Sequence, residues 1–179
     1  MKKLLFGLIA TAVTAAAISA YAANSLPTPV MSDATATPVV SKSASYSSSS
    51  SCTPNSAIMP GSDFSPRIDD AVRTQAIKDL LTKIANCESL PYSQDGVVNH
   101  NSEGGMPQQA DGYYHEYTLI VPGRKTGDGA VPVVIGGQTY MTGTMQSTRG
   151  PERIIIGQGN EIFYTMDHYG HFVQLTIVP

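Results

Sequence analysis

The nine residues from Tyr113 to Val121 read Y-Y-H-E-Y-T-L-I-V and predict the strand around which the fold is built. All of them except Glu116 are β-branched, aromatic, Leu or His, a composition that favours a strand buried in a sheet. Alternation between the two faces of a strand puts four of them on one side: Tyr114, Glu116, Thr118 and Ile120. A carboxylate buried there needs a cationic partner, because an unpaired buried charge costs free energy. The sequence therefore predicts an acid–base phosphate site around Glu116, with its cations supplied from later in the chain: Arg149, Arg153 and His168.

The N-terminal 22 residues have the three parts of a secretory signal peptide. Lys2 and Lys3 precede an apolar stretch, and Ala20-Tyr21-Ala22 supplies a small-residue cleavage site. A membrane anchor is the alternative, but the apolar stretch is short and rich in Ala. We expect a secreted or periplasmic protein with no membrane contact after cleavage. Without the two leader lysines, 9 Lys+Arg remain against 14 Asp+Glu, which excludes nucleic-acid binding by bulk positive charge.

The next 29 residues, 23–51, form a Ser/Thr/Pro/Ala-rich segment with no hydrophobic period, which predicts a disordered linker. The folded domain is expected to span 52–179. Its two cysteines, Cys52 and Cys87, predict one disulfide in an oxidising compartment, and two buried free thiols are the alternative.

A helix is predicted from Ser65 to about Asn86. Ser65 is a suitable N-cap, and Pro66 suits the first helical position. Apolar residues recur every four positions and predict the face that packs on a sheet: Ile68, Val72, Ala76, Leu80 and Ile84. Charged residues are assigned to the outer face: Arg73, Lys78, Asp79 and Lys83.

Further strands are predicted at 97–98, 153–156, 161–165 and 171–178. We therefore expect an α+β fold, with one N-terminal helix packed on a four- to five-stranded antiparallel sheet. The segment 124–147 reads as an inserted hairpin that turns at Gly136-Gly137. It would cap a cleft, extend a substrate contact or only decorate an edge of the sheet.

Five motifs in this order carry a family resemblance: P-Y-S-Q-D-G-V-V at 91–98, G-Y-Y-H-E-Y-T at 112–118, P-G at 122–123, T-R-G-x-x-R-I-I at 148–155 and Y-T-x-D-H-Y-x-x-F at 164–172. Together they resemble the secreted microbial guanyl-specific ribonucleases, the streptomycete enzymes most and barnase more distantly. The resemblance runs from the helix to the C-terminus. It is interrupted at 124–147, where close relatives turn tightly between two strands.

The resemblance implies three catalytic residues. Glu116 matches the family's general base, which takes the proton of the ribose 2′-hydroxyl. His168 matches its general acid, which protonates the departing 5′-oxygen. Arg149 and Arg153 match the two arginines that bind the phosphate, and Tyr169 matches a tyrosine beside it. The catalytic set implied is Glu116, Arg153 and His168.

The resemblance also implies a guanine-binding loop. Asn101 and Glu103 match the residues of that loop, and His100 and Ser102 lie beside them in the base-binding segment. Asn99 stands where the streptomycete enzymes carry an aromatic that stacks on the base, and Ser102 replaces a basic residue. We therefore expect guanine preference with weakened affinity, because stacking contributes ~1–3 kcal/mol per base.

The resemblance implies an endoribonuclease that cleaves single-stranded RNA 3′ of guanosine, and the chemistry of these residues agrees with it. Transesterification would give a 2′,3′-cyclic phosphate, which is then hydrolysed to the 3′-phosphate. No metal or cofactor is implied, a monomer is expected, and a barstar-like protein inhibitor is a candidate partner. The alternatives are a non-catalytic exported binding domain and an antibacterial ribonuclease toxin on the same fold.

Overall fold

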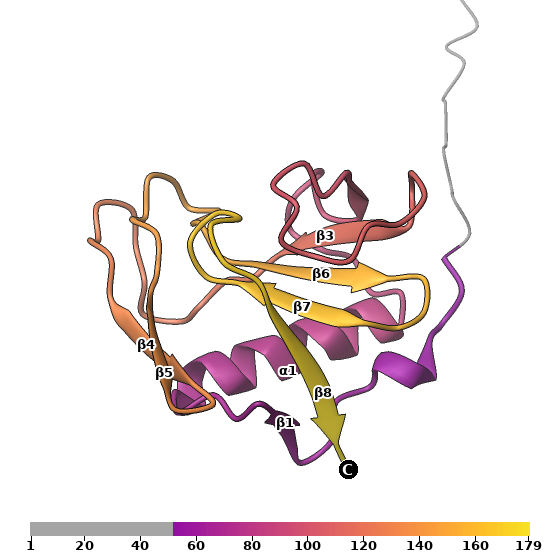
Figure 1. Cartoon of the computed structure of the whole chain (residues 1–179), viewed down its shortest axis with the longest axis horizontal. Helices are drawn as coiled ribbons and strands as arrows, with labels where there is room; N and C mark the ends of the chain where they lie inside the picture. Colours follow the sequence, from indigo (N-terminus) through magenta and orange to yellow (C-terminus); the bar gives the residue numbers. More distant parts are fainter. Residues whose placement is uncertain (1–51) are drawn as a thin grey trace, which may run out of the picture. The chain divides into compact units, whose positions relative to one another are not determined.

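The computed structural model describes residues 52–179, and the predicted signal peptide and linker lie outside the described residues. In that part of the chain, one α-helix packs on a six-stranded antiparallel sheet, with a separate two-stranded hairpin beside it (Figure 1). The helix α1 spans Ala71–Ala85, and a short 3-10 helix, η1, spans Ser56–Ile58. The sheet has the order β1-β8-β7-β6-β3-β2, with these bounds: β1 Asp63–Ser65, β2 Val97–Asn99, β3 Tyr114–Thr118, β6 Arg153–Gly157, β7 Ile162–Thr165 and β8 Val173–Val178.

The predicted α+β class is confirmed, but the prediction of four to five strands is wrong by one. The additional strand is β1, which pairs antiparallel with β8 through Phe64 and Ile177. Three residues carry too little alternation to predict a strand, and β1 exists because the C-terminal strand offers it an edge to pair with.

The helix begins later than predicted. Its N-cap is Asp70, whose carboxylate accepts a hydrogen bond from the Arg73 N–H at 3.0 Å. Ser65 lies instead in β1, and Pro66 precedes the helix. The predicted apolar face is also displaced, since Val72 is 51% exposed and Arg73 is buried. Residues four apart drift by about 40° around a helix of 3.6 residues per turn, so a row spaced by four cannot stay on one face.

The two faces of the sheet have different contents. One face packs against α1 and holds the main hydrophobic core, which includes Ile77, Leu81, Ile154 and Tyr164. The other face carries a smaller apolar cluster: Met106, Tyr114, Ile155 and Phe163. The register aligns Glu116 with Ile155, and Ile155 with Phe163, so Glu116 projects on this second face. Burial alternates along β3 as predicted, with Tyr114, Glu116 and Thr118 buried. Ile120 lies beyond the end of the strand and is exposed.

A buried ionic cluster joins α1 to the sheet. Arg73 donates from Nε to Glu152 Oε2 at 2.9 Å and from Nη2 to Glu152 Oε1 at 3.0 Å. The Tyr164 hydroxyl donates to the same carboxylate at 2.5 Å. Burial alone would lower the pKa of Arg73, but its hydrogen bonds and the charge of Glu152 raise it. Arg73 is therefore a core residue and does not belong to the solvent-facing set predicted from its charge.

The inserted hairpin is confirmed as β4, Pro132–Ile135, and β5, Gln138–Met141. Gly136 and Gly137 form its turn with φ values of 59° and 81°, a conformation that glycine adopts without a side-chain clash. Val133 and Ile135 enter the main core. The hairpin also bonds to the segment before α1, because the Asp69 N–H donates to the Val134 carbonyl at 2.9 Å.

A disulfide joins Cys52 to Cys87, as predicted, with 5.8 Å between their Cα atoms. It links the start of the described chain to the residues that follow α1. No helix within residues 52–179 has the length and apolar character needed to cross a membrane.

Candidate active site

Glu116 lies in the middle of β3, 8% exposed, and three polar groups converge on its carboxylate. Arg149 Nη2 donates to Oε1 at 3.3 Å. The Tyr169 hydroxyl and Asn99 Nδ2 donate to Oε2 at 2.8 Å and 3.1 Å. These contacts satisfy a carboxylate that the sheet would otherwise bury at a cost. They also fix it in one orientation, as a general base requires.

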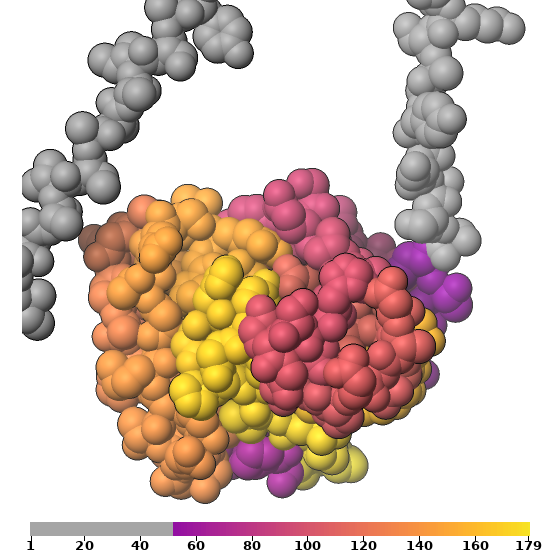
Figure 2. Space-filling view, turned by 45° about the horizontal axis from the view of Figure 1, so that its top comes forward, coloured from indigo at the N-terminus to yellow at the C-terminus, as the bar shows by residue number. Residues whose placement is uncertain are grey.

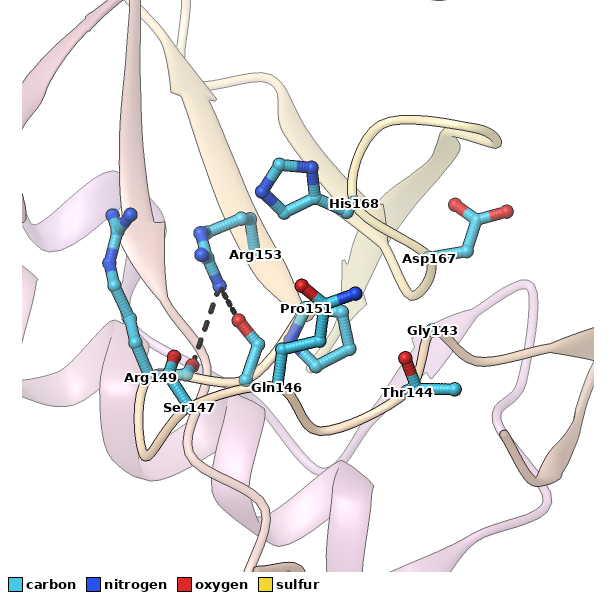
Figure 3. A pocket seen from close by; sticks show the side chains of 10 residues that line it. Gly143, Thr144, Gln146, Ser147, Arg149, Pro151, Arg153, Asp167 and His168 are labelled. Carbon is cyan, nitrogen blue, oxygen red and sulfur yellow. Dashed lines mark hydrogen bonds between the residues drawn. The ribbon is translucent and has the colours of Figure 1, made fainter. Parts of the chain in front are cut away.

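The two predicted phosphate-binding arginines come from the segment before β6 and from its first residue. Arg149 is oriented by Thr118, whose hydroxyl accepts from Nε at 2.8 Å. Arg153 is buried, and its Nη1 donates to the Gly150 carbonyl at 2.9 Å (Figure 3). The same atom donates to the Glu152 carbonyl at 2.7 Å. The Arg153 Nε has no hydrogen-bond partner among the described residues.

This pair of guanidiniums has the charge expected of an anion site. Burial, and then the positive charge of Arg149, lower the pKa of Arg153. An anion placed between the two side chains would relieve their repulsion and accept from their guanidinium N–H groups. A phosphate has the charge and the acceptor oxygens to do so.

His168 and Tyr169 lie in the turn between β7 and β8. Both adopt positive φ, 59° and 74°, which is uncommon for residues with a side chain. The turn is held by the Tyr169 N–H, which donates to Thr165 Oγ1 at 2.9 Å, and by the His168 N–H, which donates to the Pro151 carbonyl at 3.2 Å. The His168 ring is exposed and lies 4.6 Å from the Tyr169 ring, centroid to centroid. Tyr169 thereby connects Glu116 to His168.

The Tyr169 hydroxyl is kept as a donor to Glu116. Burial first, and then the hydrogen bond and charge of Glu116, raise the pKa of Tyr169. It therefore stays protonated through the neutral range and continues to orient the carboxylate.

A pocket of about 500 Å³ opens beside His168. It is lined by Gly143, Thr144, Gln146, Ser147, Arg149, Gly150, Pro151, Arg153, Asp167 and His168 (Figure 3). Figure 2 shows the C-terminal segment (yellow) on the surface between the insertion (orange) and the rose-coloured loops around β2 and β3. The insertion therefore forms a wall of the site and does not merely decorate an edge of the sheet.

The predicted base-binding residues follow β2, and the structure gives them different surroundings. Asn101 is buried with φ 51°, and its side chain bonds to the loop itself, donating to the Met106 carbonyl at 2.8 Å and accepting from the Met106 N–H at 3.1 Å. His100 is paired with Asp111 at 2.7 Å on the surface. Ser102 and Glu103 are exposed. Asn101 thus shapes the loop that presents Glu103.

Sequence reasoning missed the contact between this loop and Glu116. Asn99 was singled out only for the aromatic side chain it lacks. In the structure its amide donates to Glu116, and its Oδ1 accepts from the Asn101 N–H at 2.9 Å. The register of β2 and β3, which pairs Asn99 with Tyr114 and Val97 with Glu116, brings these groups together. The strand at 97–98 was predicted, but not the partner that sets this register.

Fold and site together define a small α+β protein with a carboxylate, two arginines and a histidine on the open face of an antiparallel sheet. A family model described as ribonuclease matches residues 48–176, and the chain belongs to this ribonuclease family. The resemblance found from the motifs is thereby confirmed.

Two curated relatives and one solved structure illustrate the match. Guanyl-specific ribonuclease Sa of Kitasatospora aureofaciens is 42% identical over 95 residues, which cover 52% of this chain and 76% of that protein. Guanyl-specific ribonuclease St of Saccharopolyspora erythraea is 42% identical over 88 residues, which cover 49% of this chain and 64% of that protein. A crystal structure of ribonuclease Sa2 with guanosine-2′-cyclophosphate has 30% identity and a TM-score of 0.42, and the match covers 59% of this chain and 86% of that one.

Proposed function

We propose that this protein is an exported endoribonuclease that cleaves single-stranded RNA 3′ of guanosine. One observation carries the proposal: Tyr169 lies between Glu116, 2.8 Å from its hydroxyl, and His168, whose ring is 4.6 Å away. A base and an acid brought together next to two arginines suit in-line displacement at phosphorus.

RNA carries its own nucleophile, so the enzyme has only to move protons and stabilise charge. Glu116 would accept the proton of the 2′-hydroxyl, and the 2′-oxygen would attack phosphorus. His168 would donate a proton to the 5′-oxygen as its bond to phosphorus breaks. The product is a 2′,3′-cyclic phosphate, and a water molecule that enters from the His168 side would hydrolyse it to the 3′-phosphate. Each proton transfer typically contributes about 10²–10⁴-fold to the rate.

The arginines would stabilise the negative charge that develops on the non-bridging oxygens. Arg153 is held by backbone carbonyls and Arg149 by Thr118, so both guanidiniums are oriented before the reaction. Arg149 and Arg153 both line the pocket, and their guanidinium N–H groups would supply the donors. In the free protein Arg149 also contacts Glu116, and a bound phosphate would compete for that guanidinium.

Glu103 is proposed to select guanine. Its carboxylate would accept hydrogen bonds from N1–H and the 2-amino group of the base, while adenine offers no N1–H. Gly105 keeps the loop close to the active-site face, because a Cβ on this residue would lie 2.1 Å from the Phe172 ring. Met106 and Tyr114 anchor the loop in the smaller apolar cluster.

Dinucleoside phosphates test the proposal directly. We expect kcat/KM for GpC to exceed that for ApC, UpC and CpC, and end analysis to identify guanosine 2′,3′-cyclic phosphate. Glu103→Gln should reduce the G-over-A ratio about tenfold or more, since a mismatched polar contact costs ~1–3 kcal/mol. Glu88→Gln, a change of an exposed Glu elsewhere on the surface, is the matched control. Equal rates on all four substrates, or full discrimination by Glu103→Gln, would refute guanine recognition by this loop.

A further inference from the structure

The pocket beside His168 is larger than a phosphate requires. Its volume of about 500 Å³ lies in the range of about 300–1,000 Å³ typical of sites for whole small molecules. The two arginines occupy only one side of it, and four lining residues come from the insertion: Gly143, Thr144, Gln146 and Ser147.

The chemistry of in-line displacement places the pocket on the leaving-group side. His168 lines it, whereas Glu116 does not. The proposed acid faces the departing 5′-oxygen, and the nucleoside attached to that oxygen must extend away from the phosphate past His168. The space there is bounded by the insertion.

The wall that the insertion provides is fixed in place. Met145 is buried and forms two backbone hydrogen bonds with the loop before the hairpin. Its N–H donates to the Asp128 carbonyl at 2.9 Å, and its carbonyl accepts from the Gly127 N–H at 2.8 Å. The Gly143 N–H donates to the Met166 carbonyl at 2.9 Å, which joins the wall to the turn that carries His168.

The polar side chains of this wall are free to bind a ligand. Thr142 is satisfied within the fold, since its hydroxyl accepts from the Val131 N–H at 3.0 Å. In contrast, Thr144, Gln146 and Ser147 are exposed, and within residues 52–179 no side-chain hydrogen bond is formed by any of the three. Gln146 extends its amide over Pro151 toward His168 (Figure 3).

We propose that the insertion builds a binding subsite for the nucleoside 3′ of the scissile phosphate, with Gln146 as its main polar contact. An amide offers both a donor and an acceptor to a base edge or ribose hydroxyl. The rigid wall keeps the cost of ordering it low. The inference rests on the proposed ribonuclease function and adds a substrate contact from a segment where close relatives turn tightly.

Two substrates that share guanosine and the scissile phosphate test the subsite. The leaving group of GpC is a nucleoside, whereas that of guanosine 3′-methyl phosphate is only methanol. The measured quantity is the ratio of their kcat/KM values, which reports the contribution of the leaving nucleoside. Gln146→Ala should reduce that ratio about threefold to tenfold, the effect of losing one net hydrogen bond. Removing the three side chains together, in Thr144→Ala/Gln146→Ala/Ser147→Ala, should reduce it further.

Gln138→Ala is the matched control, because Gln138 is exposed in β5 of the same insertion and does not line the pocket. It should keep the wild-type ratio. A wild-type ratio in both the Gln146→Ala and the triple variant, in an enzyme that cleaves GpC, would overturn the subsite alone. A wild-type protein that cleaves neither substrate would overturn the ribonuclease function and the subsite with it.

Discussion

The two faces of the sheet carry the same three chemical groups in opposite settings. On the helix face, Glu152 is joined to Arg73 and Tyr164, and all three are buried. On the open face, Glu116 is joined to Arg149 and Tyr169, but the Arg149 side chain is 22% exposed and a pocket opens beside it. Arg73 makes two bonds to Glu152, whereas Arg149 makes a single bond to Glu116, at 3.3 Å.

This comparison separates a structural ion cluster from a reactive one. Arg73 is bonded to Glu152 and Asp70, and Glu152 also accepts from Tyr164, so the groups of this buried cluster are engaged within the fold. Glu116 and Arg149 are joined by one long contact, and the Arg149 side chain is partly exposed and lines the pocket. The same residue types therefore stabilise the fold where they are sealed and are available for chemistry where they face the cleft.

The largest effect is expected on the open face. Glu116→Ala and His168→Ala should each lower kcat/KM for GpC by about 10²–10⁴-fold, because each removes one proton transfer. Thermal unfolding should show that both variants remain folded. Undiminished turnover by either purified variant would contradict the proposed mechanism.

On the helix face, a substitution should lower the stability of the fold instead of the catalytic rate. Glu152→Gln keeps the side-chain size but removes one of the two carboxylates paired with the buried Arg73 and leaves it only Asp70, so the free energy of unfolding should fall by up to about 3–5 kcal/mol. Chemical denaturation measures this loss. Replacing all three polar groups, as in Arg73→Met/Glu152→Met/Tyr164→Phe, should recover much of it. A Glu152→Gln variant of wild-type stability would contradict a structural role for the cluster.

Alkaline pH should distinguish the two tyrosines. Burial, reinforced by the charge of Glu152, raises the pKa of Tyr164 well above its usual value. The folded state then holds the phenolic proton more tightly than the unfolded state. This contribution to stability is complete below pH ~10, the unfolded pKa, and is lost as pH rises toward the folded pKa.

Denaturation curves at increasing pH will measure this loss. Tyr164→Phe should flatten the decline of stability above pH ~10. Tyr169→Phe should flatten it less, because Tyr169 is only partly buried and its pKa is raised less strongly. Equal slopes in the wild type and in Tyr164→Phe would show that other groups cause the decline.

The smallest effect concerns Asn99, at the edge of the open cluster. Asn99→Ala removes a donor to Glu116 and an acceptor for the Asn101 N–H, and should lower kcat/KM for GpC by up to about tenfold. Asn86→Ala, a change of an exposed Asn just after α1, is the control. Asn99→Phe would gain stacking on the base but lose the contact to Glu116, so its KM should fall while its kcat falls too. A full wild-type kcat/KM in Asn99→Ala would remove Asn99 from the site.

The open face was largely predictable from sequence because its information is local. Period-two alternation in one strand placed Glu116 with Tyr114 and Thr118, and short motifs identified the cations. The ionic cluster on the helix face was not predictable from sequence, because its partners Arg73 and Glu152 are 79 residues apart. A charged residue on a helix reads as solvent-exposed unless its distant counterion is known, which is why Arg73 was assigned to the wrong face.

Two other features also depended on distant pairing. Strand β1 is defined by its hydrogen bonds to the C-terminal β8, and Asn99 acquired its role from the pairing of β2 with β3. The hairpin itself was predicted from its Gly-Gly turn, whereas its place against the segment before α1 was not. Local patterns thus identified the elements, and contacts between distant residues decided what each one touches.

The anchoring of the insertion limits how it can be moved between proteins. Val133 and Ile135 belong to the main core, and the hairpin exchanges backbone hydrogen bonds with Arg67 and Asp69. The hairpin therefore cannot be transferred to another protein by itself. A graft into a relative with a tight turn must also carry the residues before α1 and the core positions that receive the two apolar side chains.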